Sequence, residues 1–435
     1  MRKTVFAMLL ATTGLFSQAQ ATDLIQIYQQ ALANDAVIAS ARASLAAGEE
    51  RVVQGRAGLL PTMNLSGSRR QTEQRDDHSY SNSYSLRLTQ PLFNLGSWET
   101  YQKGKLQTEV SVAQFAQVQQ DLILRVAQAY FDVLIAEDTL SSILSEKEAT
   151  SEQLAFAKRN FEVGTATITD TYEAQARYDL IIAQELAARN SVAIARSALE
   201  QITAIPVDTL AELRTNVDLH GPQPEQIDSW VTTAQASNYA VVAQELTLEM
   251  TRRDIRLQRA GHAPTLGLVA ERGRTDRDNI SPSNTNGTSN TITLQLNVPL
   301  FSGFDVNSKV NEAIALQERE RANLTNARRT AAQAAREAYF SVNSGLSQIK
   351  ALEAAEASSL SALEANQLGY QVGVRINIDV LNSQQQLFIA RRDLSRARYE
   401  TLLNSLRLKA AAGILTEVDI HHINDLLYYP AKTTQ

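Results

Sequence analysis

A turn motif that occurs twice constrains the fold of this chain more than any other feature of the sequence. Three positions of the first copy keep one spacing of 209 residues to the second: Phe161 and Tyr370, Gly164 and Gly373, Asp170 and Asp379. Glycine interrupts a long helical pattern at both places, and glycine is common at helix ends because it adopts left-handed backbone angles without strain. The sequence therefore predicts two helical hairpins with tight turns at 164–169 and 371–377.

Apolar residues recur every seven positions along the helix that leads into each turn, which is the spacing of a coiled-coil seam. The first ladder comprises Val126, Val133, Leu140, Leu154 and Phe161, and the second comprises Val342, Ile349, Leu363 and Tyr370. Lys147 interrupts the first ladder and Glu356 interrupts the second. A helix of about 66 residues is a rod of about 100 Å, because each residue adds about 1.5 Å. We expect hairpins over about 97–204 and 303–412, and the ladders are also compatible with a solid bundle that encloses no channel.

A period of two replaces the helical period in front of each rod, and this period predicts β-strands. We expect strands within about 62–93, around a polar loop at 71–79, and within about 264–300, around a polar loop at 276–290. Apolar side chains share one face of these strands, whereas Ser, Thr, Gln, Asn and Arg share the other. The fold class is therefore a mixture of long helices and half-apolar strands.

The strands indicate an oligomer if they enter a membrane. After residue 21 no stretch of about 18 to 20 residues is continuously apolar, so a membrane-inserted form must be a closed barrel. The smallest filled barrel needs about eight strands, which is more than the four expected here. Several chains must then pool their strands. The alternative is a soluble sheet packed against the helices, and the pattern alone leaves that reading open.

The remaining segments set the expected boundaries. Residues 1–21 combine Arg2-Lys3, an apolar run and Ala19-Gln20-Ala21, which predicts a secretory signal peptide, with a short membrane anchor as the alternative. We expect a first repeat at 22–205, a proline-rich hinge at 206–224, a second repeat at 225–413 and a C-terminal segment at 414–435.

Composition argues against several classes of function. The chain has no cysteine, so it forms no disulfide or thiolate metal site, and its net charge of −6 disfavours a nucleic-acid partner. We find no nucleophile elbow, phosphate loop or zinc signature, so we expect neither an enzyme nor a cofactor. His421 and His422 with Asp419 and Asp425 suggest a metal site, but a polar surface helix is the favoured interpretation.

The turn stretches and the two Pro-Leu-Phe strand ends resemble the TolC family of outer-membrane efflux ducts. The resemblance covers essentially the whole mature chain, and its most specific pieces are Phe161-Glu162-Val163-Gly164, Ile168-Thr169-Asp170, Gly369-Tyr370-Gln371-Val372-Gly373 and Ile378-Asp379-Val380-Leu381-Asn382. It implies a homotrimer in the outer membrane of a Gram-negative bacterium, with a 12-stranded barrel continuous with a 12-helix periplasmic tunnel. It also implies two protein partners: a periplasmic adaptor (membrane fusion) protein, and an inner-membrane transporter that is either a proton-driven pump or an ABC ATPase.

The resemblance also assigns roles at the turns. A constriction ring corresponds to Asp379 and Asn382, and the second position is an aspartate in the family. The family's closing links correspond to Tyr370 and Arg375, which reach to Thr169 and Asp170. Gln153 matches a further link residue, but its acidic counterpart in the family is Gln367 here. Adaptor contacts fall on the turns, at Gly164, Thr165, Gly373 and Val374.

Two further readings stand beside these roles. Asp170 with Glu173 fits a helix capping box, and Asn377 or Asp379 serves the start of the second helix in the same way. At the level of function, the sequence favours a passive exit duct for tripartite efflux pumps, type I secretion or both, gated at its periplasmic tip. The alternative is a non-conducting structural or receptor coiled-coil protein of the outer membrane.

Overall fold

A computed structural model describes residues 22–74, 77–206, 209–214, 217, 219–278 and 287–428 of the chain. The expected signal peptide at 1–21 lies outside the described residues. So do a few residues of the expected hinge and residues 429–435 of the expected C-terminal segment.

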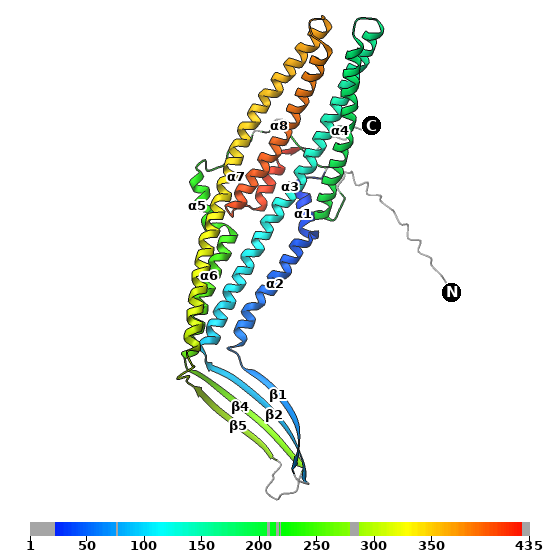
Figure 1. Ribbon diagram of the computed structural model, residues 1–435. Helices are drawn as coiled ribbons and strands as arrows, with labels where there is room; N and C mark the ends of the chain where they lie inside the picture. The colour runs from blue at the N-terminus through cyan, green and yellow to red at the C-terminus, as the bar shows by residue number, and fades with distance from the viewer. Residues whose placement is uncertain are drawn as a thin grey trace, which may run out of the picture.

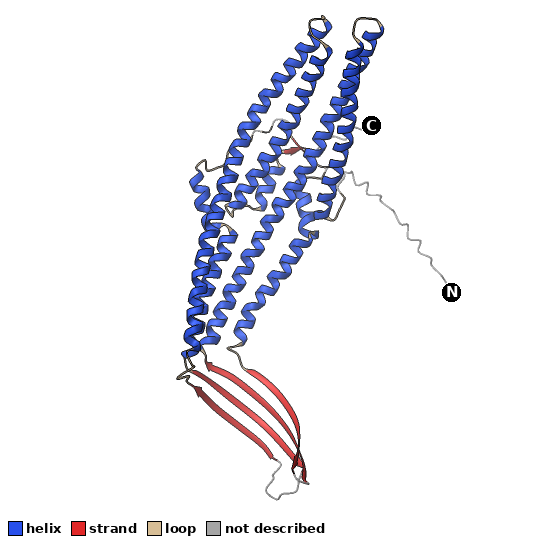
Figure 2. Cartoon of the chain, in the orientation of Figure 1, coloured by secondary structure: helices blue, strands red, loops and turns tan. Residues whose placement is uncertain are grey.

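The described residues form long helices and one main sheet (Figures 1 and 2). The helices are α1 (Leu24–Asn34), α2 (Ala36–Ala57), α3 (Leu95–Glu162), α4 (Ile168–Thr203), α5 (Ile227–Ser237), α6 (Tyr239–Arg259), the short 3₁₀ helix η1 (Ala260–His262), α7 (Asp305–Gln371), α8 (Asn377–Ala411) and α9 (Glu417–Asn424). The strands are β1 (Thr62–Gln74), β2 (Asp77–Phe93), β3 (Glu212–Leu213), β4 (Thr265–Asp278), β5 (Gly287–Asn297) and β6 (Leu427–Tyr428). Within these ranges, no helix is both long enough and apolar enough to span a bilayer.

Two helical hairpins dominate the molecule, as the seven-residue ladders predict. The first hairpin consists of α3 and α4, and the second consists of α7 and α8. α3 has 68 residues and α7 has 67, so each is a rod of about 100 Å. Both hairpins turn at the same end of the molecule, and we call this end the tip (Figure 1).

The main sheet lies at the opposite end from the tip (Figure 2). Its antiparallel strands follow the order β1-β2-β4-β5, so β1 and β5 are edge strands within the chain. The described helices extend from one end of the sheet and cover neither of its faces (Figures 1 and 2). The reading as a soluble sheet packed against helices is therefore wrong.

The strands are longer than the sequence predicts. Residues 71–74 and 77–79 continue the β1–β2 ladder, with Thr72 opposite Ser79, so the expected loop at 71–79 is wrong. The expected loop at 276–290 is likewise too long, because β4 extends to Asp278 and β5 begins at Gly287, while 279–286 lie outside the described residues. Polar residues on both faces do not end a strand when its neighbour continues to supply backbone hydrogen bonds.

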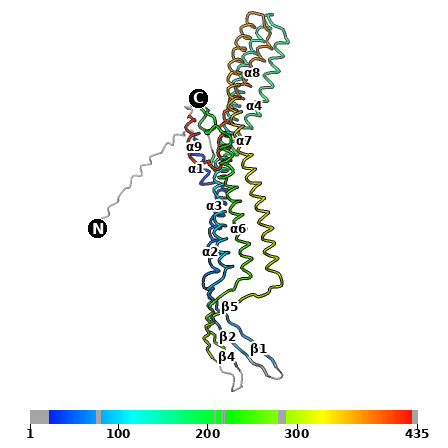
Figure 3. Tube along the Cα trace, turned by 90° about the vertical axis from the view of Figure 1, so that its left-hand side faces the viewer, coloured from blue at the N-terminus to red at the C-terminus, as the bar shows by residue number. Residues whose placement is uncertain are grey.

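The main apolar core lies midway along the rods. α1 and α9 pack there beside α3 and α8, and Figure 3 shows them on one side of the bundle. The hydroxyl of Tyr130 donates to the Ala211 carbonyl oxygen at 2.7 Å, and the Phe131 and Tyr399 rings lie 5.6 Å apart. β3, from the expected hinge, pairs with β6 near the C-terminus. This region therefore joins the middle of the chain to its end.

Glycine allows close approach of α2 to α3. A Cβ at Gly104 would lie 2.6 Å from the carbonyl oxygen of Arg51, and a Cβ at Gly55 would lie 3.1 Å from that of Thr100. A side chain at either position would push the two helices apart. Small residues thus set the spacing of the bundle next to the sheet.

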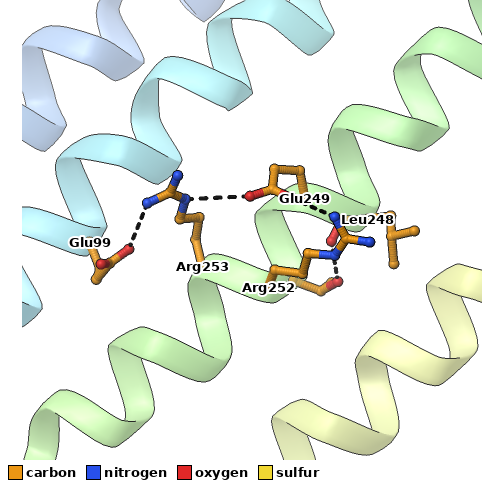
Figure 4. A network of polar contacts seen from close by, with 6 residues as sticks. Glu99, Leu248, Glu249, Arg252 and Arg253 are labelled. Carbon is orange, nitrogen blue, oxygen red and sulfur yellow. Dashed lines mark hydrogen bonds and ion pairs between the residues drawn. The ribbon is translucent and has the colours of Figure 1, made fainter.

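Charged side chains hold α6 against the start of α3 (Figure 4). Arg253 on α6 lies 3.4 Å from the buried carboxylate of Glu99 on α3 and 3.6 Å from Glu249 on its own helix. Lys103 donates to Asp254 at 2.7 Å one turn further along α3. Both contacts lie close to the junction with the sheet, so they fix the helices at the point where the chain changes from helix to strand.

Candidate functional site

The two turns at the tip have the same backbone conformation. Gly164 and Gly373 adopt positive φ angles of 81° and 80°, which glycine accepts without a Cβ clash. The Thr165 amide donates to the Asn160 carbonyl oxygen at 2.8 Å, and the matching Val374 amide donates to the Gly369 carbonyl oxygen at 2.9 Å. The turns occupy 163–167 and 372–376, so Ile168 and Thr169, predicted as turn residues, already belong to α4.

Apolar side chains are exposed on both turns. Val163, Val372 and Val374 are 72%, 65% and 74% exposed. Thr165 and Thr169 are also exposed. Solvated turns normally carry polar residues, whereas these valines leave apolar surface exposed at the tip.

Asp170 caps the start of α4. Its carboxylate accepts from the Thr167 amide at 3.0 Å and from the Thr167 hydroxyl at 2.9 Å, and the Asp170 amide lies 3.4 Å from the same hydroxyl oxygen. This is a capping box. The box was expected between Asp170 and Glu173, and that pairing is wrong, because Thr167 is the residue immediately before the helix.

Asn377 joins the two hairpins. Its side chain is completely buried, and it accepts from Gln153 on α3 at 2.5 Å while donating to the Asp170 carbonyl oxygen on α4 at 3.1 Å. Gln153 therefore contacts Asn377 and not Gln367. Asn377 was expected as a cap of the second helix, and this expectation is wrong, because Ile376 is the N-cap residue of α8 and no side chain caps that end. The sequence signal for this role is an amide side chain at the first position of a helix. If such a side chain is buried, it needs hydrogen-bond partners from another element.

Tyr370 packs beside the same contact. Its ring meets that of Phe156 edge to face at 5.7 Å. The hydroxyl oxygen is buried and faces Asn160 and Asp170 on the first hairpin without a well-formed hydrogen bond. Burial raises the pKa of Tyr370 above its ordinary value, with a further contribution from the charge of Asp170. Tyr370 and Asp170 are thus close to each other within one chain.

The other candidate residues lie on α8 and the turn before it. Arg375 lies 3.7 Å from Asp379 rather than beside Asp170. Asn382 accepts from Arg177 of α4 at 3.2 Å, and Arg177 also donates to Gln385 at 2.7 Å. Arg177 is a second bridge between the hairpins that the sequence analysis did not identify. Apart from Thr169 and Tyr370, the predicted link residues and the predicted ring residues therefore take part in polar contacts at the tip.

The side chains of this site hold the two hairpins together. They are amides, two carboxylates, two guanidinium groups and a phenol, and all except the phenol have hydrogen-bond or ion-pair partners. Among the described residues no group of three or more His, Cys, Asp or Glu side chains is placed to hold a metal ion. Asp419, part of the proposed metal alternative, is instead bonded to Lys409 at 2.6 Å.

Comparison with known proteins is consistent with this architecture. The matching family model is described as outer membrane efflux protein and covers residues 27–204 and 230–414. The chain is 33% identical to outer membrane protein TolC of Escherichia coli, over 98% of this chain and 89% of that protein. It is 31% identical to the alkaline protease secretion protein AprF of Pseudomonas aeruginosa, over 93% of this chain and 87% of that protein.

Solved structures of outer-membrane channels have the same fold. The structure is similar to that of CusC, with a TM-score of 0.79 and 18% identity over 90% of this chain and 92% of that chain. It is also similar to the outer membrane protein VceC of Vibrio cholerae, with a TM-score of 0.78 and 16% identity over 90% of this chain and 96% of that chain.

Proposed function

The chain belongs to the outer membrane efflux protein family, and on that premise we propose that it is the outer-membrane exit duct of efflux pumps and type I secretion systems. Its relatives are channel proteins rather than enzymes. Two relatives are named as secretion proteins for proteases, which supports polypeptides among the exported substrates. The relatives do not favour a non-conducting structural role.

The duct that we propose is a homotrimer. Each chain contributes an arc of strands with two unpaired edges, β1 and β5, and unpaired edges are not viable in lipid. Three copies supply twelve strands, which exceeds the roughly eight that close the smallest barrel. The helical hairpins of the three copies then continue the barrel as a tunnel into the periplasm. Each chain carries two internal repeats, 22–205 and 225–413, on either side of the hinge at 206–224.

The gate that we propose lies at the tip. The observation that carries this proposal is the joint between the hairpins, in which Asn377 bonds to Gln153 and to the Asp170 backbone. Tyr370 and Arg375 restrain the same end by acting on Asp170 and Thr169 within a chain and across neighbours. The Arg375 side chain is exposed, so each polar contact that it makes contributes no more than about 1 kcal/mol. A partner can therefore open the gate by replacing a few contacts.

The partners are the adaptor and the inner-membrane transporter. The adaptor contacts the turns at Gly164, Thr165, Gly373 and Val374, where valines of both turns are exposed. Three copies of Asp379, with Asn382 one turn further along α8, line the constriction. The transporter supplies the energy, since the duct itself has no energy-converting site that we identify.

Conductance in planar lipid bilayers tests the duct and its gate together. We expect the purified protein to form discrete channels, and we expect Arg375→Ser with Tyr370→Phe to raise the single-channel conductance several-fold. Arg321→Ser is a matched control, because Arg321 is exposed on α7 and pairs with Glu318 of the same helix. A parent protein without discrete channels would contradict the duct. Unchanged conductance in the double variant would contradict only the restraint by Tyr370 and Arg375.

A further inference from the structure

Strand register assigns every side chain of the sheet to one of two faces. Residues directly opposite each other in a ladder point to the same face. Leu86 lies opposite Leu65 on β1, and Leu88 lies opposite Met63 on β1 and Ala270 on β4. On β4 and β5, Leu268 lies opposite Leu294 and Leu266 lies opposite Leu296. These residues form one apolar band, which the proposed duct turns toward lipid.

The apolar band has the height of a membrane. On β2 it runs from Phe93, beside the helices, to Tyr84. These residues span about 30 Å of strand at about 3.4 Å per residue. At a strand tilt of about 40°, that length corresponds to about 23 Å along the membrane normal, close to the band of about 25 Å in outer-membrane barrels. Tyr84 therefore marks the boundary with the outer leaflet, on the side away from the periplasmic helices.

Arginines follow the band at this outer boundary, on the same face. Arg69 lies opposite Asn82, two residues beyond Tyr84 along β2, and Arg274 lies opposite Tyr84 itself. Arg272 lies opposite Leu86, one row inside the boundary, and its long side chain can extend outward to the level of Tyr84. Exposure is high for all three arginines.

The charges of these arginines are poorly compensated. Arg69 lies over the Tyr80 ring at 5.2 Å, Arg274 pairs with Asp276 at 3.0 Å, and Arg272 has no bonded partner among the described residues. On the other face, Arg87 is neutralised by two hydrogen bonds to Glu271, at 2.7 and 3.0 Å. The acidic residues Asp278 and Glu73 also share this face, but they lie one and two rows beyond Arg69. In the rows of Arg69, Arg272 and Arg274 themselves, the described residues of this face include one carboxylate, Asp276, so a net positive charge remains in these rows next to the apolar band.

We propose that Arg69, Arg272 and Arg274 form a binding site for the phosphate groups of a phosphorylated glycolipid of the outer leaflet, the lipid A part of lipopolysaccharide. Guanidinium groups bind phosphate through two parallel hydrogen bonds. The apolar band directly below holds the acyl chains of the same molecule. The proposal rests on the placement of the sheet in the outer membrane by the proposed function, but not on conduction or on the gate.

Binding of purified lipid A to the detergent-solubilised oligomer, measured by native mass spectrometry, tests the site. We expect Arg69→Gln with Arg272→Gln to weaken binding on the order of tenfold or more, because each basic residue near an anionic surface contributes about fivefold. The matched control is Arg70→Gln with Arg277→Gln. These two arginines lie opposite Ser81 on the other face of the same strands, so the control removes an equal charge.

Three outcomes would overturn the site: unchanged binding in the Arg69 and Arg272 variant, an equal loss in the control, or equal binding of dephosphorylated lipid A to the parent. Each variant is also reconstituted in bilayers of neutral phospholipid, where we expect channels like those of the parent. A parent that binds lipid A but forms no channels would contradict the proposed duct and leave the lipid site supported. The reverse result would contradict the lipid site alone.

Discussion

Single polar side chains fix the ends of the helices in this protein. Asp35 stands between α1 and α2, where its carboxylate accepts from the Ile38 amide at 2.8 Å and from Arg125 at 3.0 and 3.1 Å. Asn377 does comparable work at the tip, where one buried amide holds two hairpins together. Asp35 stabilises a change in chain direction, whereas Asn377 adds to an apolar cluster that also joins the hairpins and consists of Leu154, Ala157, Ala174 and Leu381.

The ionisation of Asp35 should make the free energy of unfolding of the helical region depend on pH. Burial alone would raise the pKa of Asp35, but the hydrogen bonds from Arg125 and the Ile38 amide hold it below its ordinary value of 3.8. A carboxylate with a lowered pKa stabilises the fold above that ordinary value, and this contribution is lost as the pH falls through the folded-state pKa. Asp35→Asn keeps a capping oxygen and removes the charge, so we expect it to cost about 1 kcal/mol at pH 7.

Thermal unfolding followed by circular dichroism checks this expectation. The melting temperature of Asp35→Asn should lie below that of the parent at pH 7, and the two should converge well below pH 3.8. Asp35→Ala is the control that also removes the cap, and its deficit should persist in acid. A constant difference between parent and Asp35→Asn at all pH values would show that the ion pair with Arg125 is not responsible.

At the scale of residues, the sequence predicted the turns better than the joint between them. Gly164 and Gly373 are visible in sequence because a positive φ angle selects glycine locally. The cap that Asp35 forms is local in the same sense, since a capping residue acts on amides two or three positions away. Asn377 depends on how one hairpin packs against the other, and no local pattern records that packing.

At the scale of elements, substitutions on the two faces of β5 test whether one face of the sheet meets lipid. Leu294 on β5 is 64% exposed, and Thr293 beside it points to the other face. Leu294→Arg should destabilise the inserted form by about 2–4 kcal/mol if its face lies in the middle of the bilayer. Thr293→Arg should be tolerated, since in the proposed barrel that face lines a wet lumen.

The measurement is the fraction of folded oligomer recovered from lipid vesicles for each variant. Leu296→Arg and Gln295→Arg repeat the comparison one step along β5, with Leu296 on the face of Leu294 and Gln295 on that of Thr293. Equal recovery of the Leu and the Thr or Gln variants would exclude the barrel.

The lengths of the strands were harder to predict than the faces. Period-two alternation identified the apolar face of β2 and β5 correctly, because burial in lipid or protein demands one polarity per face. At 71–79 both faces are polar, so alternation disappears although the β1–β2 ladder continues. Backbone pairing extends a hairpin without any requirement on side-chain type, and its extent is therefore invisible to a polarity pattern.

At the scale of the whole molecule, the proposed threefold assembly brings copies of Asp379 together. Three carboxylates on one axis attract cations, so the duct should prefer cations and be partly blocked by multivalent ones. Within a chain Arg375 lies 3.7 Å from Asp379, a distance that offers only weak compensation. Asn382 adds no charge, and we expect Asn382→Asp to strengthen the block and Asp379→Asn to abolish most of it.

The measurement is the single-channel conductance of the parent and of these two variants as a function of the concentration of added multivalent cation. Glu356→Gln is a control, because Glu356 lies on α7 away from the tip and is paired with Arg391 at 2.9 Å. If Asp379→Asn leaves both the block and the cation preference intact, Asp379 serves only the start of α8 and the constriction lies elsewhere.

The unpaired edges of the sheet also have a consequence for biogenesis. If the proposed trimer is correct, a newly exported chain cannot place β1 and β5 in lipid before they pair with the edges of other chains. Insertion and assembly must therefore be a single kinetic event, and its rate rises more steeply than in proportion to the number of chains waiting in the periplasm. When expression of this protein falls, the number of assembled ducts should therefore fall more steeply than the number of chains. A periplasmic protein that holds the strand edges apart would set the rate at which ducts form.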